Sequence, residues 1–373
     1  MRIAVLAAAK SIHTIKWVKA FAKNGHVVKL FSLPDQKAPP GVLDDIRVHY
    51  LHRGGVAGYW LCARELKKQL LQFRPDVLNV HYASGYGTLG RLCGIKPVLL
   101  SVWGSDVYDF PNAGQINKRM LIKNLEAATA IASTSYAMAE QVRRVHLTDK
   151  KIYITPFGVD TSVFCRCGEP PKDRITIGIV KALEPKYGVE YLIRAFSLFK
   201  NRMIKENKMP PNGIKLEIYG DGSLLPSLKA LAHELNIEEE VQFHGAVPHA
   251  YVPRIMSSFD IFCAPSVEDS ESFGVAAVEA MACEVPVVVS DVDGFKEVVI
   301  NNETGFIVTR RDPVLLANKL FTLAVSPELR YTMGQAGRRH VQDCYEWSDC
   351  VRKMENALTE TAMSSLMMNR RNS

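Results

Sequence analysis

The sequence predicts an α/β protein with two parallel-sheet domains, and three observations support this prediction. The chain has 373 residues, of which 47% are hydrophobic and 23% charged, so it is long enough for two sizeable cores. Strand-like and helix-like segments alternate in both halves, which is typical of a parallel sheet covered by helices on both faces. Residues 156–174 interrupt the alternation with prolines, glycines and little periodicity, so we interpret them as the linker.

The first half supplies seven predicted strands with helices between them. Apolar residues recur at helical spacing in residues 13–24, where Gly25 ends the helix, and a further helix is expected over residues 59–73. The predicted strands are residues 3–8, 26–32, 47–51, 76–81, 96–102, 129–133 and 152–156.

The second half repeats this rhythm and ends in helix. From residue 327 to about residue 360 the chain is expected to be helical. The predicted strands are residues 175–180, 215–219, 241–245, 260–266 and 285–291, and the predicted helices are residues 189–200, 224–235, 251–257 and 275–283.

An acidic loop between a strand and a helix is the strongest candidate site. Glu271, Ser272, Phe273 and Gly274 follow a buried strand, and Glu279 lies in the helix that begins at this loop. Ligands bind at the carboxyl ends of strands in open α/β sheets, and the start of a helix offers unpaired N–H groups. The other interpretation is an acidic loop before an ordinary amphipathic helix.

Two further turns in the second half carry candidate groups. Lys181 and Lys186 flank the turn after residues 175–180 and can both reach a diphosphate, unless they are two solvated lysines. Gly220 belongs to a Tyr-Gly-Asp-Gly turn after a strand. The third glycine of a dinucleotide fingerprint is absent because Leu225 stands there, so binding of NAD is only weakly indicated.

In the first half, polar and aromatic residues follow three strands. Ser11 and His13 follow the first strand, His81 ends another, and the Trp-Gly-Ser-Asp run from Trp103 to Asp106 follows a third. They are expected to face the same cleft. His13 can equally be a surface residue, and Asp106 can be a turn or helix cap.

These motifs resemble the retaining glycosyltransferases of family 4, also called glycosyl transferases group 1. The resemblance rests on Glu271-x7-Glu279 with its Ser-Phe-Gly turn and on the VPVVVSDVDGFKEVV that follows. It implies the GT-B architecture, two Rossmann-like domains facing each other across a cleft. Residues 1–165 would be the acceptor-side domain and residues 166–345 the nucleotide-sugar-binding domain, with a last helix over about residues 346–365 packing back on the first.

The resemblance also implies roles for individual residues. Family members often have Gly-Gly after the first strand, where this chain has AAKSIHTIKW, and Tyr187 occupies a position where lysine is usual. The expected catalytic residues are Glu271, Lys181, Lys186 and Asp106; the donor-binding residues are Gly220, Val247, Ser272, Phe273, Gly274, Val275 and Glu279; the acceptor-side residues are Ser11, His13, His81, Trp103 and Ser105.

The expected reaction is retaining hexosyl transfer from a UDP- or GDP-sugar to a glycan or lipid-linked acceptor, in polysaccharide or glycolipid synthesis. Neither a cofactor nor a metal is expected. Asp291-Val-Asp293 has the form of a metal motif but lies in the glycine loop that follows the Glu-x7-Glu motif in the family. Two alternatives remain open: a nucleotide-sugar epimerase of similar architecture, and a non-catalytic nucleotide-sugar-binding protein.

Charge and cysteine content predict the location. Residues 1–165 hold 22 Lys and Arg against 11 Asp and Glu, a net charge of +11, while the remaining residues carry −4. Basic clusters around Arg64, Lys118 and Arg143, with the apolar Ile116, Met120, Leu121 and Ile122, favour docking on an anionic membrane surface. Eight cysteines without paired metal spacing indicate reduced thiols in a cytoplasmic protein, peripheral on the inner face of the plasma membrane. No nucleic-acid partner is expected.

Overall fold

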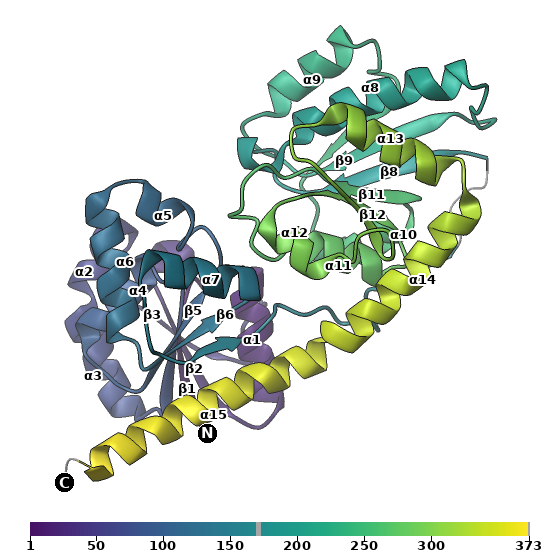
Figure 1. Ribbon diagram of the computed structural model, residues 1–373. Coiled ribbons are helices and arrows are strands. Elements are labelled where there is room, and N and C mark those ends of the chain that lie inside the picture. Colours follow the sequence, from purple (N-terminus) through teal and green to yellow (C-terminus); the bar gives the residue numbers. More distant parts are fainter. Residues whose placement is uncertain (169–172, 372–373) are drawn as a thin grey trace. The chain divides into compact units, whose positions relative to one another are not determined.

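The computed structural model describes residues 1–168 and 173–371, with side chains as far as residue 364 (Figure 1). The chain forms two compact units. The first comprises residues 1–157 together with residues from Ser348 onward, and the second comprises Gly158–Trp347. Residues 169–172 of the predicted linker lie outside the described part.

A seven-stranded parallel sheet forms the first unit, in the order β3-β2-β1-β4-β5-β6-β7. The strand β1 pairs in parallel with both β2 and β4, so the order of connection reverses between β1 and β4. The strands are β1 (Arg2–Leu6), β2 (Val27–Ser32), β3 (Arg47–Tyr50), β4 (Val77–His81), β5 (Val98–Val102), β6 (Ala130–Ser133) and β7 (Ile152–Ile154).

Helices connect these strands, and α4 contacts α2, α3 and α6. The helix expected over residues 59–73 is instead two helices, because Cys62, with φ of −84° and ψ of 1°, departs from helical geometry between α2 and α3. The helices are α1 (Ile12–Lys23), η1 (Pro34–Gln36), α2 (Gly55–Leu61), α3 (Ala63–Phe73), α4 (Gly85–Cys93), α5 (Asp109–Asn112), α6 (Gln115–Ala127) and α7 (Tyr136–Val145).

A six-stranded parallel sheet forms the second unit, in the order β10-β9-β8-β11-β12-β13. Here the reversal falls between β8 and β11. The strand β13, which the sequence analysis did not predict, lies at one edge of the sheet and pairs with β12. The strands are β8 (Ile175–Val180), β9 (Ile214–Tyr219), β10 (Val241–Gly245), β11 (Ile261–Ala264), β12 (Val287–Ser290) and β13 (Gly305–Val308).

Helices cover both faces of this sheet, with α8, α9 and α13 on one face and α10, α11 and α12 on the other (Figure 1). Their bounds are η2 (Pro185–Tyr187), α8 (Val189–Lys205), α9 (Leu225–Glu234), η3 (His249–Tyr251), α10 (Val252–Ser257), α11 (Val275–Ala282), α12 (Asp293–Val298), α13 (Pro313–Ala324) and α14 (Pro327–Cys344).

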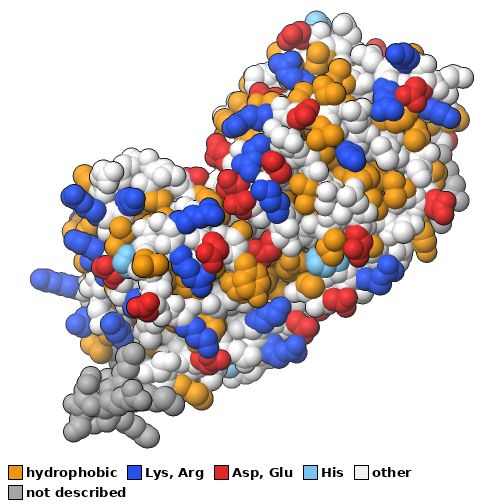
Figure 2. Space-filling view, in the orientation of Figure 1, with side chains coloured by type: hydrophobic (Ala, Val, Ile, Leu, Met, Phe, Trp, Pro, Cys, Tyr) orange, Lys and Arg blue, Asp and Glu red, His pale blue; other side chains and the backbone are white. Residues whose placement is uncertain are grey.

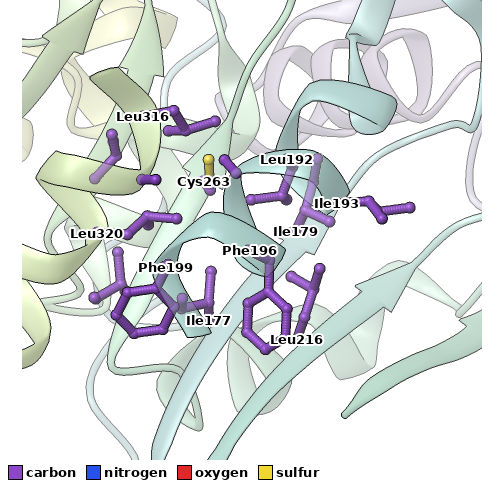
Figure 3. Packing of buried hydrophobic residues seen from close by; sticks show 14 of the residues in the cluster. Ile177, Ile179, Leu192, Ile193, Phe196, Phe199, Leu216, Cys263, Leu316 and Leu320 are labelled. Atoms are coloured by element: carbon purple, nitrogen blue, oxygen red, sulfur yellow. The ribbon is translucent and has the colours of Figure 1, made fainter. Parts of the chain in front are cut away.

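The core of the second unit is centred on α8. Leu192, Phe196 and Phe199 recur at helical spacing, and all three are completely buried (Figure 3). They pack against Ile177 of β8 and Leu320 of α13. This packing holds β8 in the middle of the sheet.

The helical end of the chain is broken at Tyr345 and Glu346, close to residue 346, where the last helix was expected to begin. The carbonyl of Tyr345 accepts a hydrogen bond from the N–H of Val159 (2.8 Å), and the N–H of Trp347 donates to the carbonyl of Val159 (3.0 Å). These bonds replace helical ones. They also explain why residues 158–165 belong to the second unit, although the sequence analysis drew the boundary after residue 165.

The last helix, α15 (Trp347–Arg371), lies with the first unit from Ser348 onward. Met354, Ala357 and Leu358 are buried on its inner face. Glu355 accepts hydrogen bonds from the side chains of Asn24 (2.9 Å) and His26 (3.1 Å), just after α1. Among the described residues, no helix combines the length and apolarity needed to cross a membrane.

Candidate functional site

In the second unit, two charged side chains meet where the order of strand connection reverses. Lys181 follows β8, Glu271 lies in the loop after β11, and the two form an ion pair. The Lys181 side chain is 22% exposed and that of Glu271 only 9%. The sequence prediction named both residues, and the structure places them in contact at the carboxyl edge of the sheet, where such sheets bind ligands.

An aromatic ring and a second lysine complete this cluster. The ammonium of Lys181 lies 4.4 Å from the centre of the Tyr187 ring, and that of Lys186 lies 5.2 Å from it. Burial disfavours the charged form of Lys181, but Glu271 outweighs this effect, with help from Tyr187, and raises the pKa of Lys181. Lys181 is therefore a cation throughout the physiological pH range.

The loop carrying Glu271 continues into α11 through a glycine in the left-handed region. Gly274 has φ of +79°, and a Cβ there would lie 2.6 Å from the Phe295 ring, so both conformation and space require glycine. Ser272 and Phe273 are buried before it, whereas Val275 at the start of α11 is partly exposed. The first N–H groups of a helix lack partners within the helix and favour anions.

Glu279 lies in α11 and is only 5% exposed. Its carboxylate is 2.9 Å from Nε2 of His249, a residue of η3 that the sequence analysis did not select. The two are thirty residues apart in sequence, so the contact appears only in the folded chain. The charge of Glu279 also acts on Lys181, which links it to the cluster around Glu271.

Neighbouring loops close around Lys181 by tight backbone contacts. Gly220 has φ of +139°, and a Cβ there would lie 1.8 Å from the carbonyl oxygen of Lys181. Gly220 also donates its N–H to the carbonyl of Gly245 (2.8 Å), which ends β10, and partly buried Val247 follows two residues later. The glycines of this turn thus serve close packing between the loops.

Of the Asp291-Val-Asp293 motif, Asp291 is held by an arginine that the sequence analysis did not select, whereas the N–H of Asp293 donates to Asp269 (3.1 Å). Arg310 donates to the carboxylate of Asp291 (3.0 Å) and to that of Asp269 (3.0 Å), so it ties the loop after β12 to the loop after β11. Partial burial acts in the opposite direction, but these bonds lower the pKa of both aspartates. Arg310 follows β13, the strand that was not predicted, so its position was not apparent.

In the first unit, a pocket of about 190 Å³ lies at the corresponding reversal between β1 and β4. Ser11, His81 and Trp103, all expected on the acceptor side, are among its lining residues. The others are Ala8, Gln36, Tyr59, Tyr82, Ser84, Gly85 and Tyr86.

Trp103 is the centre of an aromatic cluster in this unit. Its ring lies 4.5 Å from that of His81 and 5.4 Å from that of Phe157, between ring centres. His13 stacks on Phe157 at 4.0 Å. His13 is therefore part of the aromatic cluster and not an isolated surface residue.

Asp106 is 1% exposed, and its carboxylate accepts hydrogen bonds from the N–H groups of Ala83 (2.8 Å), Trp103 (3.0 Å) and Gly104 (2.9 Å). Burial raises its pKa even though these bonds act in the opposite direction. The side chain thus caps the turn, which was the alternative left open from the sequence, and joins the loops after β4 and β5. Ser105 lies 3.4 Å from the hydroxyl of Tyr82.

His81 is 1% exposed and occupied at both ring nitrogens, by Asn79 (2.8 Å) and Thr14 (3.4 Å). Burial, and to a lesser extent His13, lowers its pKa from 6.5 to about 3. The ring is therefore neutral at physiological pH and shapes the pocket without carrying charge.

This neutral histidine predicts an acid sensitivity. As pH falls from 6.5 toward 3, the unfolded chain binds a proton at position 81 that the folded chain excludes. Stability is therefore present above pH 6.5 and is lost below it, by up to about 1.4 kcal/mol per pH unit. Urea unfolding at a series of pH values gives the free energy of unfolding as a function of pH. Below pH 6.5 this free energy should fall less steeply in His81→Gln than in wild type. His233→Gln, at an exposed position, should show the same pH dependence of the unfolding free energy as wild type. An equal pH dependence in all three proteins would contradict a neutral, buried His81.

Comparison with known protein families agrees with this arrangement. The model "Glycosyl transferases group 1" matches residues 167–340, and the model "Glycosyl transferase 4-like" matches residues 2–135. A GDP-mannose-dependent alpha-(1-6)-phosphatidylinositol monomannoside mannosyltransferase of Mycobacterium tuberculosis is 27% identical, covering 72% of this chain and 71% of its own length. A D-inositol 3-phosphate glycosyltransferase of Xylanimonas cellulosilytica is 24% identical over 93% of this chain and 90% of its own.

Solved structures share the fold. A sucrose-phosphate synthase from Thermosynechococcus elongatus superposes with a TM-score of 0.84 at 20% identity, covering 98% of this chain and all of the other. HepE from Anabaena, solved with UDP and glucose, superposes with a TM-score of 0.80 at 17% identity, covering 96% of this chain and all of its own. The fold is therefore GT-B, and the chain belongs to the glycosyl transferases group 1 family.

Proposed function

We propose that this glycosyltransferase moves a hexose from a UDP- or GDP-sugar to a glycan or lipid-linked acceptor, with retention and without a metal. The contact between Lys181 and Glu271 carries the proposal, because it puts a cation and a carboxylate side by side at a ligand-binding edge. The similar proteins support the donor class: one relative is GDP-mannose-dependent, and HepE was solved with UDP-glucose. They also support acceptors such as phosphatidylinositol mannosides or inositol phosphate for cell-surface glycolipid synthesis.

The electrostatic task is to stabilise the charge that develops on the leaving nucleoside diphosphate. Lys181, Lys186 and the N–H groups at the start of α11 supply fixed positive ends for it. Glu271 would accept hydrogen bonds from sugar hydroxyls, and Glu279, beside His249, would hold the ribose diol. The leaving phosphate would take the proton of the acceptor hydroxyl on the same face of the sugar, so this proposal needs neither a second carboxylate nor a metal.

The first unit would receive the acceptor. Its pocket is lined by hydroxyls and aromatic rings, including Ser11, Tyr82 and Trp103, which are suited to a sugar or polyol. Asp106 and His81 would position this pocket, since the carboxylate of Asp106 and both ring nitrogens of His81 are already bonded within the protein.

The transfer reaction separates this proposal from its alternatives. We would screen UDP-, GDP-, ADP- and CMP-sugars by thermal shift, and then measure nucleoside diphosphate release with and without acceptor, in EDTA. The expected result is stabilisation by one nucleotide class and acceptor-dependent release. Epimer formation without release would indicate a nucleotide-sugar epimerase, and binding without turnover a non-catalytic protein. Activity that returns only with Mg²⁺ or Mn²⁺ would contradict the metal-free mechanism.

Substitution of Glu279 and substitution of Glu271 should affect different steps of the reaction. Glu279→Gln should weaken nucleotide binding by about 100-fold, because the ribose loses a charged hydrogen-bond acceptor, while Glu271→Gln should chiefly lower kcat by a similar factor. Both substitutions keep the side-chain volume. Glu234→Gln, on the exposed end of α9, is the matched control and should behave as wild type. Wild-type nucleotide affinity in Glu279→Gln would remove the ribose assignment.

Peripheral binding to the anionic cytoplasmic leaflet is a further part of the proposal, and the structure changes the residues that would carry it. Leu121 is completely buried, so it is unavailable to a membrane, whereas Ile116 of the same helix is 80% exposed. Figure 2 shows Lys and Arg side chains spread over the visible face of the first unit among acidic and apolar ones, not gathered in one patch.

The helices α2 and α3 provide the better surface. Val56, Trp60 and Leu61 of α2 are 78%, 49% and 55% exposed. The next helix, α3, presents a shallow groove lined by Arg64, Lys67, Lys68, Leu71, Gln72 and Arg74. Apolar side chains beside basic ones are the combination that inserts into an anionic lipid surface, at about 1 kcal/mol per engaged cation.

Vesicle flotation tests this binding. The protein should float with anionic vesicles at low salt and should not float with neutral vesicles or at high salt, because salt screens the attraction. Lys67→Glu/Lys68→Glu should abolish flotation. Lys205→Glu/Lys208→Glu, an exposed pair in the second unit, should not. Equal behaviour in every condition, with efficient transfer to a soluble acceptor, would exclude membrane docking and leave the glycosyltransferase assignment intact.

A further inference from the structure

A cluster of three different metal-ligating side chains lies in the first unit, outside the site described above. His52 follows β3, Cys62 stands between α2 and α3, and Glu65 lies in the first turn of α3. One ligand atom from each residue lies within 4.8 Å of the other two. Inspection of cysteine spacing did not reveal this cluster, because only one of its members is a cysteine.

Helical spacing and hydrogen bonds bring these three atoms together. Cys62 and Glu65 are three residues apart at the start of a helix, so their side chains share one face. The residue His52 is held over that face, since its N–H donates to Oε2 of Glu65 (3.1 Å) and its Nδ1 bonds to the same oxygen. The sulfur of Cys62 is 3.8 Å from the same Nδ1.

A fourth residue orients the carboxylate from behind. Nε2 of His49, in β3, is 3.0 Å from Oε1 of Glu65, the oxygen that does not face His52. Metal ligands in proteins are commonly fixed in this way by a second hydrogen-bonding partner. Glu65 is thereby aimed at His52 and Cys62, as a preformed ligand would be.

The burial of the cluster suits an ion bound at the protein surface. Cys62 is completely buried, the Glu65 side chain is 25% exposed and the His52 side chain is 55% exposed. The sulfur therefore lies on the protein side of the cluster and the imidazole on the solvent side.

We propose that His52, Cys62 and Glu65 bind one Zn²⁺ ion, with water as the fourth ligand. Zinc accepts nitrogen, sulfur and carboxylate ligands in tetrahedral geometry, at about 2.0–2.3 Å, and a 3.8 Å separation between nitrogen and sulfur is close to what that geometry requires. Nδ1 of His52 and Oε2 of Glu65, which are hydrogen-bonded to each other, would move apart to admit the ion. The ion would tie the end of β3 to the junction of α2 and α3. This inference is independent of the proposed donor and acceptor chemistry.

Metal titration of the full chain tests the site. After removal of bound metal with a chelator, wild-type protein should take up one equivalent of Zn²⁺ in competition with a chromophoric chelator. With Co²⁺ as the probe it should show a thiolate-to-cobalt charge-transfer band. Cys62→Ala should abolish that band, and His52→Ala, at an exposed position, should weaken Zn²⁺ binding by more than about 100-fold. His49→Gln, which removes only the outer partner, should weaken it by about 10- to 100-fold.

The other thiols supply the control. Cys165 and Cys167 are more accessible and are only two residues apart, so they are the competing place for a zinc ion. The double variant Cys165→Ala/Cys167→Ala should bind Zn²⁺ as wild type does. Circular dichroism of each variant checks that the fold is kept. Failure of wild type to hold one equivalent, or loss of binding in the double variant with retention in His52→Ala, would overturn the proposal.

Discussion

Lys181 and Glu271 leave two neighbouring strands and meet in a nearly closed environment, and much of the second unit is arranged to permit that contact. Removing two charges from water is costly unless each finds its partner, and deleting one partner leaves the other buried and unpaired. The surrounding loops approach so closely that Gly220 nearly touches the carbonyl of Lys181. Glycine at this position is therefore required by its positive φ and by the close approach of the Lys181 backbone.

In the first unit, the loops at the reversal of strand order are joined without exposed charged groups. At its own reversal of strand order the loops are joined by the buried carboxylate of Asp106, and the pocket is lined by hydroxyls and by rings around Trp103. His81 is neutral there because burial disfavours its protonated form. A charged edge in one unit and a neutral, aromatic edge in the other fit a division between an anionic donor and a polyhydroxylated acceptor.

Features that depend on residues close together in sequence were predicted, whereas features that depend on distant residues were not. All seven strands of the first sheet were predicted, because each is a short run containing apolar or β-branched residues between helical segments or turns. The β13 edge strand and the break at Cys62 were not. The start of the last helix near residue 346 was expected from the family resemblance, whereas the hydrogen bonds between Val159 and the break arise only in the folded chain. The same limit applies to the site. Glu271 and Lys181 stood out by motif, whereas His249 and Arg310 acquire their roles only through partners that the folded chain brings to them.

The break at Cys62 connects the two proposals for the first unit. Because α2 stops there, the apolar Trp60 and Leu61 belong to one helix and the basic Arg64 and Lys67 to the next, so the relative direction of the two groups depends on this junction. The same break places the sulfur of Cys62 beside His52 and puts Glu65 one turn further along. An ion held by these residues would fix the junction from the side of β3. The surface proposed to meet the membrane would then be presented in one orientation, since the ends of both helices would share a single anchor.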